Sequence, residues 1–155
     1  VQKMYDANVI ALFPSIGNFF RTECFRQNML EIGKDVTVEK QIFYQTKVAE
    51  TLKKGDLAIV ISHANRTPHV EDFIRVMNKN QVTTVLISST KESELSKLVD
   101  YHLYFASYED SEEKIASFSS RASLQFLLDC LYACYFNKDY EKNIDYRIER
   151  YIELS

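Results

Sequence analysis

Short apolar runs alternate with longer helix-like segments along this chain, and this alternation constrains the fold more than any other feature. Apolar runs of strand length occupy residues 8–13 (NVIALF) and 57–61 (LAIVI), and a further strand is expected at residues 82–87. Such runs are typical of strands that are buried on both faces, as in parallel sheets. We expect two shorter strands at residues 35–38 and 101–105.

The segments between the strands have helical patterns. The expected helical segments are residues 19–32, 40–52, a helix beginning at Pro68 behind the N-cap Thr67, a short turn at 93–99, a long helix at 110–136 opened by the capping box Asp110-Ser111-Glu112-Glu113, and a C-terminal helix within 138–155. Strands that alternate with helices predict an α/β fold, here a three-layer sandwich around a five-stranded parallel, flavodoxin-like sheet of order 2-1-3-4-5. The 155 residues are expected to form a single domain.

The helices differ in how their apolar residues are distributed. After Pro68, the residues Val70, Phe73, Ile74 and Met77 share one narrow face, as expected for a helix that packs on a sheet. The helix at 19–32 and the second half of the one at 110–136 are instead apolar on nearly every side. A helix of that kind is contacted from more than one side. We therefore expect a homodimer or a higher homo-oligomer.

Composition excludes several classes of protein and site. The 19 basic residues are scattered among 22 acidic ones, so this segment alone is not expected to bind DNA or RNA. No apolar run approaches the ~18 residues that a membrane span requires. Three cysteines argue against a disulfide framework and favour a reducing, cytoplasmic location. The histidines His63 and His69 lack the spacing and partners of a metal site, and no metal or cofactor is predicted.

Polar residues follow the first and third predicted strands, at residues 14–18 and 62–67. In open parallel sheets, ligands bind beyond the carboxyl ends of the strands, where the strand order reverses. The second loop also opens a helix, whose unpaired N–H groups favour phosphate, and Ser62 and Thr67 add hydroxyl groups there. Ser88 and Ser89 follow the next strand, near the same edge. The plainer interpretation is that these residues are helix caps and turn formers.

Several segments resemble the SIS (sugar isomerase) domain, particularly the version found in RpiR-type bacterial transcription regulators. The matching stretches are GKDV at 33–36, LKKGDLAIVIS at 52–62, the loop through Thr67, TTVLISSTKESELSKLVDYHLYF at 83–105, and FSSRASLQFLLDCLY at 118–132. The resemblance implies dimerisation and the binding of a phosphosugar. It also implies an N-terminal helix-turn-helix domain, which is absent from this sequence and through which alone DNA would be bound.

The chain departs from the phosphosugar-binding pattern of this family at several positions. Ser62 and Thr67 match the loop S-x-S-G-x-T-x-E, but Ala64, Asn65 and His69 stand where serine, glycine and the acid are expected. In the first loop, Pro14 and Ile16 stand near the family's glycines, and Pro14 has no N–H to donate. The candidate ligand-binding residues are Gly17, Asn18, Ser62, His63, Asn65, Thr67, Ser88 and Ser89.

The leading hypothesis is a phosphosugar-sensing and dimerisation domain of an RpiR-like regulator of carbohydrate metabolism. A sugar phosphate, or a related phosphorylated metabolite, would bias the geometry of the dimer. The first alternative is a structural dimerisation module whose pocket no longer binds. A phosphosugar isomerase is a further alternative, disfavoured because the sequence offers no well-placed pair of glutamate and histidine. No catalytic residue is predicted.

Overall fold

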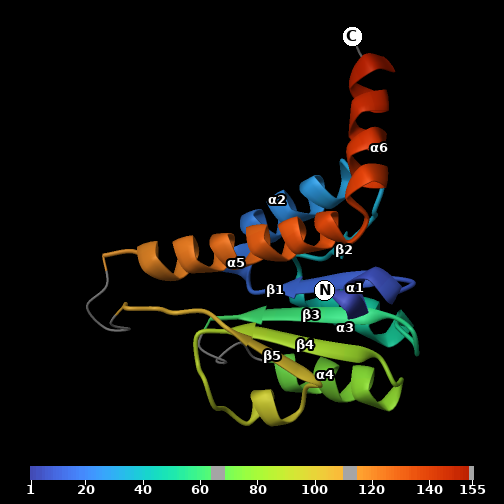
Figure 1. The fold of residues 1–155 in the computed structure, drawn as a ribbon. Coiled ribbons are helices and arrows are strands. Elements are labelled where there is room, and N and C mark those ends of the chain that lie inside the picture. Colours follow the sequence, from blue (N-terminus) through green and yellow to red (C-terminus); the bar gives the residue numbers. More distant parts are fainter. Residues whose placement is uncertain (64–68, 110–114, 154–155) are drawn as a thin grey trace.

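A five-stranded parallel sheet forms the middle layer of a computed structural model that describes residues 1–63, 69–109 and 115–153 (Figure 1). The strands are β1 (Ile10–Pro14), β2 (Thr37–Val38), β3 (Leu57–Ser62), β4 (Thr83–Ser88) and β5 (Tyr101–Tyr104). They lie in the order β2-β1-β3-β4-β5, and every neighbouring pair is parallel. All residues of β1 and β3 are buried, as their uninterrupted apolar runs predict. The predicted fold class and strand order are confirmed.

Helices cover both faces of the sheet. They are α1 (Gln2–Asp6), α2 (Phe19–Leu30), α3 (Ile42–Thr51), α4 (Val70–Lys79), α5 (Phe118–Phe136) and α6 (Tyr140–Glu153), with short 3₁₀ turns at Ile16–Asn18, Leu95–Lys97 and Asn137–Asp139. The expected C-terminal helix corresponds to α6. The five-residue α1 was not predicted, because one helical turn and a half has too little periodicity to be recognised.

The layer formed by α3 and α4 packs closely against the sheet. The four apolar residues Val70, Phe73, Ile74 and Met77 are all buried, which confirms the narrow face predicted for this helix. Phe73 stacks on Phe13 of β1, with ring centroids 5.3 Å apart. The charged residues of α4, such as Arg75, lie on the opposite, exposed side. Helix α4 therefore has an apolar inner face and a charged outer face, whereas α3 leaves Phe43 and Tyr44 exposed.

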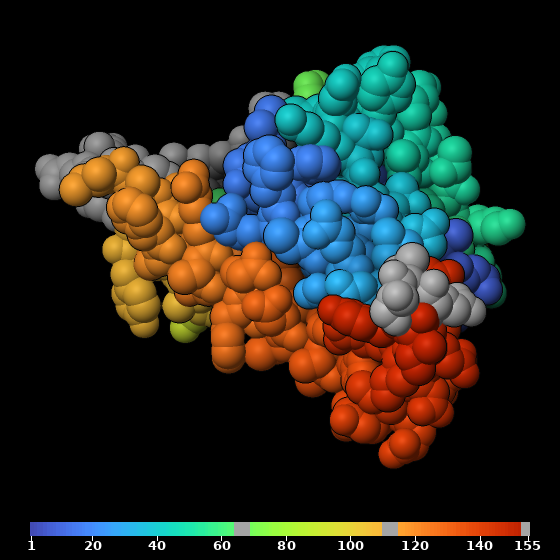
Figure 2. Space-filling model, turned by 90° about the horizontal axis from the view of Figure 1, so that it is seen from above, coloured from blue at the N-terminus to red at the C-terminus, as the bar shows by residue number. Residues whose placement is uncertain are grey.

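The opposite layer, formed by α1, α2 and α5, leaves large apolar side chains exposed. Leu124 and Leu128 of α5 pack on the sheet, but Phe118 and Phe126 of the same helix are 68% and 71% exposed. Helix α6 projects from the body of the molecule (Figure 1), and its apolar residues Tyr140, Ile148, Tyr151 and Ile152 are also exposed. Figure 2 shows α2, α5 and α6 together on one face of the molecule. The helices that are apolar on all sides are thus only partly covered by this chain.

Two predicted helix starts are wrong. Helix α5 begins at Phe118 rather than at the capping box, because residues 115–117 are not helical; residues 110–113 lie outside the described part of the chain. Helix α4 begins at Val70, and His69, expected within it, precedes it with a φ of 66°. A left-handed residue cannot continue a right-handed helix, so the helix starts after it. The predicted cap Thr67 and Pro68 lie outside the described residues.

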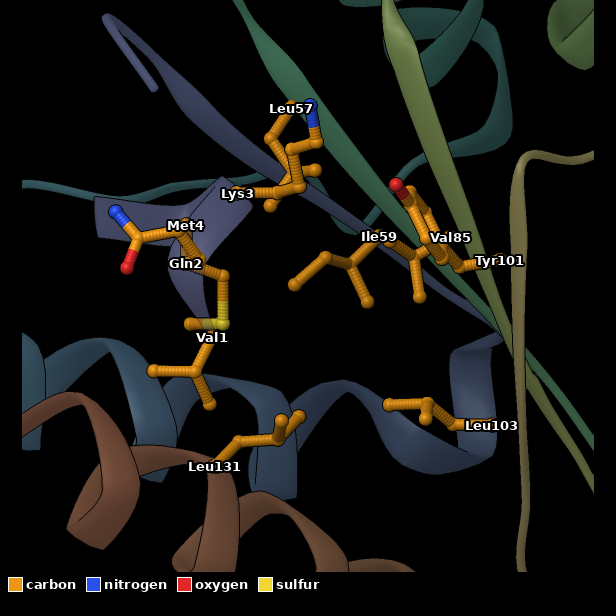
Figure 3. A pocket seen from close by; sticks show the side chains of 10 residues that line it. All are labelled: Val1, Gln2, Lys3, Met4, Leu57, Ile59, Val85, Tyr101, Leu103 and Leu131. Atoms are coloured by element: carbon orange, nitrogen blue, oxygen red, sulfur yellow. The ribbon is translucent and has the colours of Figure 1, made fainter. Parts of the chain in front are cut away.

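An apolar cavity of about 350 Å³ lies at the amino ends of β3 and β5 (Figure 3). It is lined by residues of α1, by Leu57 and Ile59 of β3, by Leu103 of β5 and by Leu131 of α5. The cavity exists because α1 is too short to cover this half of the sheet, where Leu103 remains half-buried. None of the predicted ligand residues lines it. Within the described part of the chain, no helix combines the length and hydropathy that a membrane span needs.

Candidate functional site

Three loops meet at the carboxyl edge of the sheet, opposite the apolar cavity. The backbone N–H of Ser15, after β1, donates to the carbonyl of Ile61 in β3 at 3.0 Å. The N–H of Ser89, after β4, donates to the carbonyl of His63 at 3.0 Å. The loops that follow β1, β3 and β4 are therefore tied side by side. This edge is where the strand order reverses, as the sequence-based search for a ligand site expected.

The ends of β3 and β4 place two of the predicted serines next to each other. Ser62 and Ser88 are partners in the parallel register, and both side chains are buried. The Ser88 hydroxyl donates to the carbonyl of Thr90 at 3.0 Å and lies 2.9 Å from Nε2 of His102. Its hydrogen is thus already engaged, and with no exposed surface Ser88 has no donor to offer a ligand.

His63 is the central polar residue of this edge. Its carbonyl accepts both the N–H and the hydroxyl of Ser89. Its ring nitrogen Nε2 lies 3.3 Å from the Ser107 hydroxyl and 3.6 Å from the carboxylate of Glu109. The His63 side chain is about one-third exposed, so part of its ring is accessible to solvent. His63 therefore connects the loops after β3, β4 and β5.

Glu109 is held at the start of α5. One carboxylate oxygen accepts the backbone N–H of Ser120 at 3.0 Å, and the other accepts the Ser120 hydroxyl at 2.7 Å. The first four N–H groups of a helix have no partner within it, and a carboxylate there also interacts favourably with the helix dipole. Glu109 thus caps α5 from eleven residues upstream. Its side chain is only 7% exposed.

The first loop contributes the amide of Asn18 and the hydroxyl of Ser15. Asn18 donates from Nδ2 to the Ser15 hydroxyl at 3.0 Å, which leaves its second amide hydrogen for another acceptor. A side chain at Gly17 would have no heavy atom within 4 Å, so the loop is open at that point. Asn65 and Thr67, the remaining predicted ligand residues, lie outside the described part of the chain.

The structure thus brings Asn18, Ser62, His63, Ser88 and Ser89 to one edge of the sheet. Such a set of hydroxyl, amide and imidazole groups can bind an anion or a polyhydroxylated molecule through hydrogen bonds. Among the described residues, no three His, Cys, Asp or Glu side chains are grouped so that they could hold a metal ion.

Sequence reasoning missed three residues of this edge, namely Ser107, Glu109 and Ser120. The only signal was a glutamate shortly before the pair Ser119-Ser120 at the beginning of a strong helical pattern. It was overlooked because Glu112 and Glu113 have the spacing of a standard capping box. A contact that spans eleven residues leaves no periodic trace in a sequence.

Comparison with known proteins supports the family resemblance. The model of the SIS domain matches residues 25–133. YbbH of Bacillus subtilis, an uncharacterised HTH-type transcriptional regulator, is 23% identical over 121 residues, which are 78% of this chain and 43% of that protein. The chain therefore spans less than half the length of this relative.

Solved structures share the whole fold. The NanR protein of Vibrio vulnificus, in complex with ManNAc-6P, has a TM-score of 0.86 at 20% identity, over 99% of this chain and 59% of that one. The sugar isomerase domain of an RpiR transcription factor from Sphaerobacter thermophilus has a TM-score of 0.79 at 14% identity, over 99% of this chain and 83% of that one. The match of residues 25–133 to the family model, together with the parallel sheet and its strand order, shows that this chain belongs to the SIS domain family.

Proposed function

We propose that this chain is a phosphosugar-sensing and dimerisation domain of a DNA-binding transcription regulator. The observation that carries the proposal is the joining of three loops at the carboxyl edge, with Asn18, Ser62, His63 and Ser89 on them. Its relative YbbH is an HTH-type transcriptional regulator, and the NanR structure contains the sugar phosphate ManNAc-6P. Both support the proposal that this chain is part of a regulator that binds a sugar phosphate. DNA would be bound by a separate helix-turn-helix domain of the whole protein.

The phosphate is expected near the amino end of α4 and the sugar toward the loop after β1. Ser62, Asn65 and Thr67 belong to the loop that leads into α4, where helix N–H groups and the positive end of the helix dipole favour an anion. Gly17, Asn18, His63, Ser88 and Ser89 lie at the same carboxyl edge, where the groups that remain accessible can exchange hydrogen bonds with sugar hydroxyls. No cofactor is required for binding of this kind.

The domain is expected to act as a dimer, with the exposed apolar residues of α2, α5 and α6 covered by a second copy. Contiguous exposed apolar surface on a soluble domain marks an interaction site. Phe118 and Phe126 of α5, and Ile148 of α6, would be at the centre of that contact.

A phosphosugar isomerase remains the second candidate, because His63 and Glu109 form a histidine–glutamate pair that the sequence did not reveal. A general base must have a lone pair directed at the proton that it removes. Both oxygens of Glu109 already accept hydrogen bonds from Ser120, which favours binding without catalysis. Incubation with sugar phosphates, followed by NMR, tests this: turnover that is lost in Glu109→Gln would establish the isomerase instead.

A thermal-shift screen against phosphorylated sugars and amino sugars tests the proposed function. A ligand at 100 times its dissociation constant stabilises a fold by about 2.7 kcal/mol, which gives a clear rise in melting temperature. We expect a hit that Ser62→Ala and Thr67→Ala abolish. Thr51→Ala, which removes an exposed hydroxyl on α3, is the matched control and should retain the shift. A stable dimer that responds to no sugar phosphate would instead indicate a purely structural dimerisation module.

A further inference from the structure

One continuous set of contacts connects the ligand loops to the first turn of α5. His63 directly follows Ser62 and holds Ser89 through its carbonyl. Its ring is 3.6 Å from the carboxylate of Glu109. Glu109 in turn accepts both the N–H and the hydroxyl of Ser120. A change in the charge or position of His63 therefore acts directly on the Glu109 carboxylate, which caps α5.

The capped turn also carries part of the exposed apolar face. Phe118, two residues before Ser120, is the first residue of α5. Together with Phe20 and Cys24 of α2, and with the arginines Arg21 and Arg121, it lines a hollow of about 510 Å³ between the two helices. The position of the first turn thus determines the shape of the surface shared by α2 and α5.

The geometry points to Glu109 as the positioning residue that couples occupancy of the ligand loops to self-association through the α2/α5 surface. This inference rests on the proposed function. A sugar phosphate bound before α4, with its sugar against His63, brings negative charge toward the carboxylate of Glu109, and like charges repel. The contact between Glu109 and Ser120 is weakened, and the first turn of α5 with Phe118 is released. Because the occupied and empty forms then present different surfaces, ligand and second copy affect each other's binding.

Two variants and a matched control test this link. Glu109→Gln removes the charge and preserves the shape, and Ser120→Ala removes one of the two hydrogen bonds. Ser119→Ala is the control, because its hydroxyl lies in the same turn but accepts the N–H of Tyr108 instead. The readout is the dimer dissociation constant, measured by analytical ultracentrifugation with and without glucosamine 6-phosphate and, separately, inorganic phosphate.

In the wild-type chain, binding of either probe should change the dimer dissociation constant about fivefold or more, the usual range for coupled sites. Glu109→Gln and Ser120→Ala should still bind the probe, by calorimetry, without that change, and Ser119→Ala should behave as wild type. The inference is overturned if the change persists in both variants, or if Ser119→Ala abolishes it equally.

Failure of the proposed function has a different signature, because neither probe would then bind the wild-type chain. The link is then judged without ligand, by amide hydrogen exchange over residues 118–122 and by the dimer dissociation constant. Changes in both measurements for Glu109→Gln and Ser120→Ala, but not for Ser119→Ala, would support Glu109 as the residue that positions the α2/α5 surface. No change in either measurement would overturn it.

Discussion

Helices α4 and α5, on opposite faces of the sheet, differ in how completely the chain covers their large apolar residues. In α4, the stripe of Val70, Phe73, Ile74 and Met77 is buried and the charged residues are exposed. In the layer of α2 and α5, buried Leu124 and Leu128 share a helix with exposed Phe118 and Phe126. The outer side of α4 is thus suited to water, whereas the outer side of α5 is suited to a further protein surface.

The difference teaches that apolar residues buried within one chain and apolar residues buried only in an assembly follow different sequence patterns along a helix. A helix that packs only on its own sheet has one apolar stripe. A helix that packs on both a sheet and a second copy has two, and in the isolated chain the second stripe is exposed. The predictions that follow test this distinction, beginning with α4, whose apolar stripe is buried within the chain itself.

The largest effect is expected from Phe73→Ala in α4. The ring is buried and stacks on Phe13, so its removal leaves a cavity and should lower the free energy of unfolding by about 3–5 kcal/mol. Urea denaturation at a fixed protein concentration measures the loss. Phe43→Ala removes an exposed ring from α3 of the same layer and should cost no more than about 0.5 kcal/mol. Similar losses for the two variants would contradict the described packing.

A smaller effect on folding, but a large one on assembly, is expected from Phe126→Lys in α5. The ring is exposed in the single chain, so the fold should tolerate lysine. As a central interface residue, Phe126 is expected to contribute about 2 kcal/mol to dimerisation, so that its replacement weakens the dimer about thirtyfold. Analytical ultracentrifugation measures the change. Arg75→Asp, on the exposed side of α4, is the control, and an equal effect of both variants would remove the distinction between the layers.

The smallest effect is expected from Tyr132→Phe in α5. The Tyr132 hydroxyl is buried beside the Arg147 guanidinium without a hydrogen bond of good geometry to any described residue, so its removal should be close to neutral near pH 7. A clear loss of stability in urea denaturation would show that the hydroxyl is bonded after all.

Alkaline pH sharpens this last test. Burial raises the pKa of Tyr132, and the nearby charge of Arg147 opposes the rise only in part. A raised folded-state pKa gives stability that is complete below the unfolded value of about 10 and is lost as the pH rises through the folded value. Tyr132→Phe should therefore lose less stability than wild type above about pH 10. Parallel losses in the two proteins would contradict this assignment.

The parts of the fold that were predicted correctly are those with local signatures. The apolar runs of β1 and β3 and the narrow stripe of α4 each depend on residues close together in sequence, and these elements were found. The loops after β1, β3 and β4 could be expected to meet, because parallel strands bring their carboxyl ends to one edge of the sheet.

The parts that were missed depend on contacts between distant residues. The start of α5 is set by Glu109, which reaches Ser120 across an intervening segment. The Ser88 hydroxyl is engaged by His102, fourteen residues away on the neighbouring strand. Neither contact follows from the spacing of residue types, so the roles of these side chains in the candidate site could not be deduced from the sequence.

The molar mass of the purified chain in solution tests most directly the claim that the α2/α5 layer is an interface. Light scattering at micromolar concentration should give twice the single-chain mass of 18.1 kDa. The Phe126→Lys variant should give a mass close to that of the single chain, while its unfolding remains cooperative. A wild-type chain that is monomeric at that concentration, with Phe118 and Phe126 exposed to water, would contradict the account.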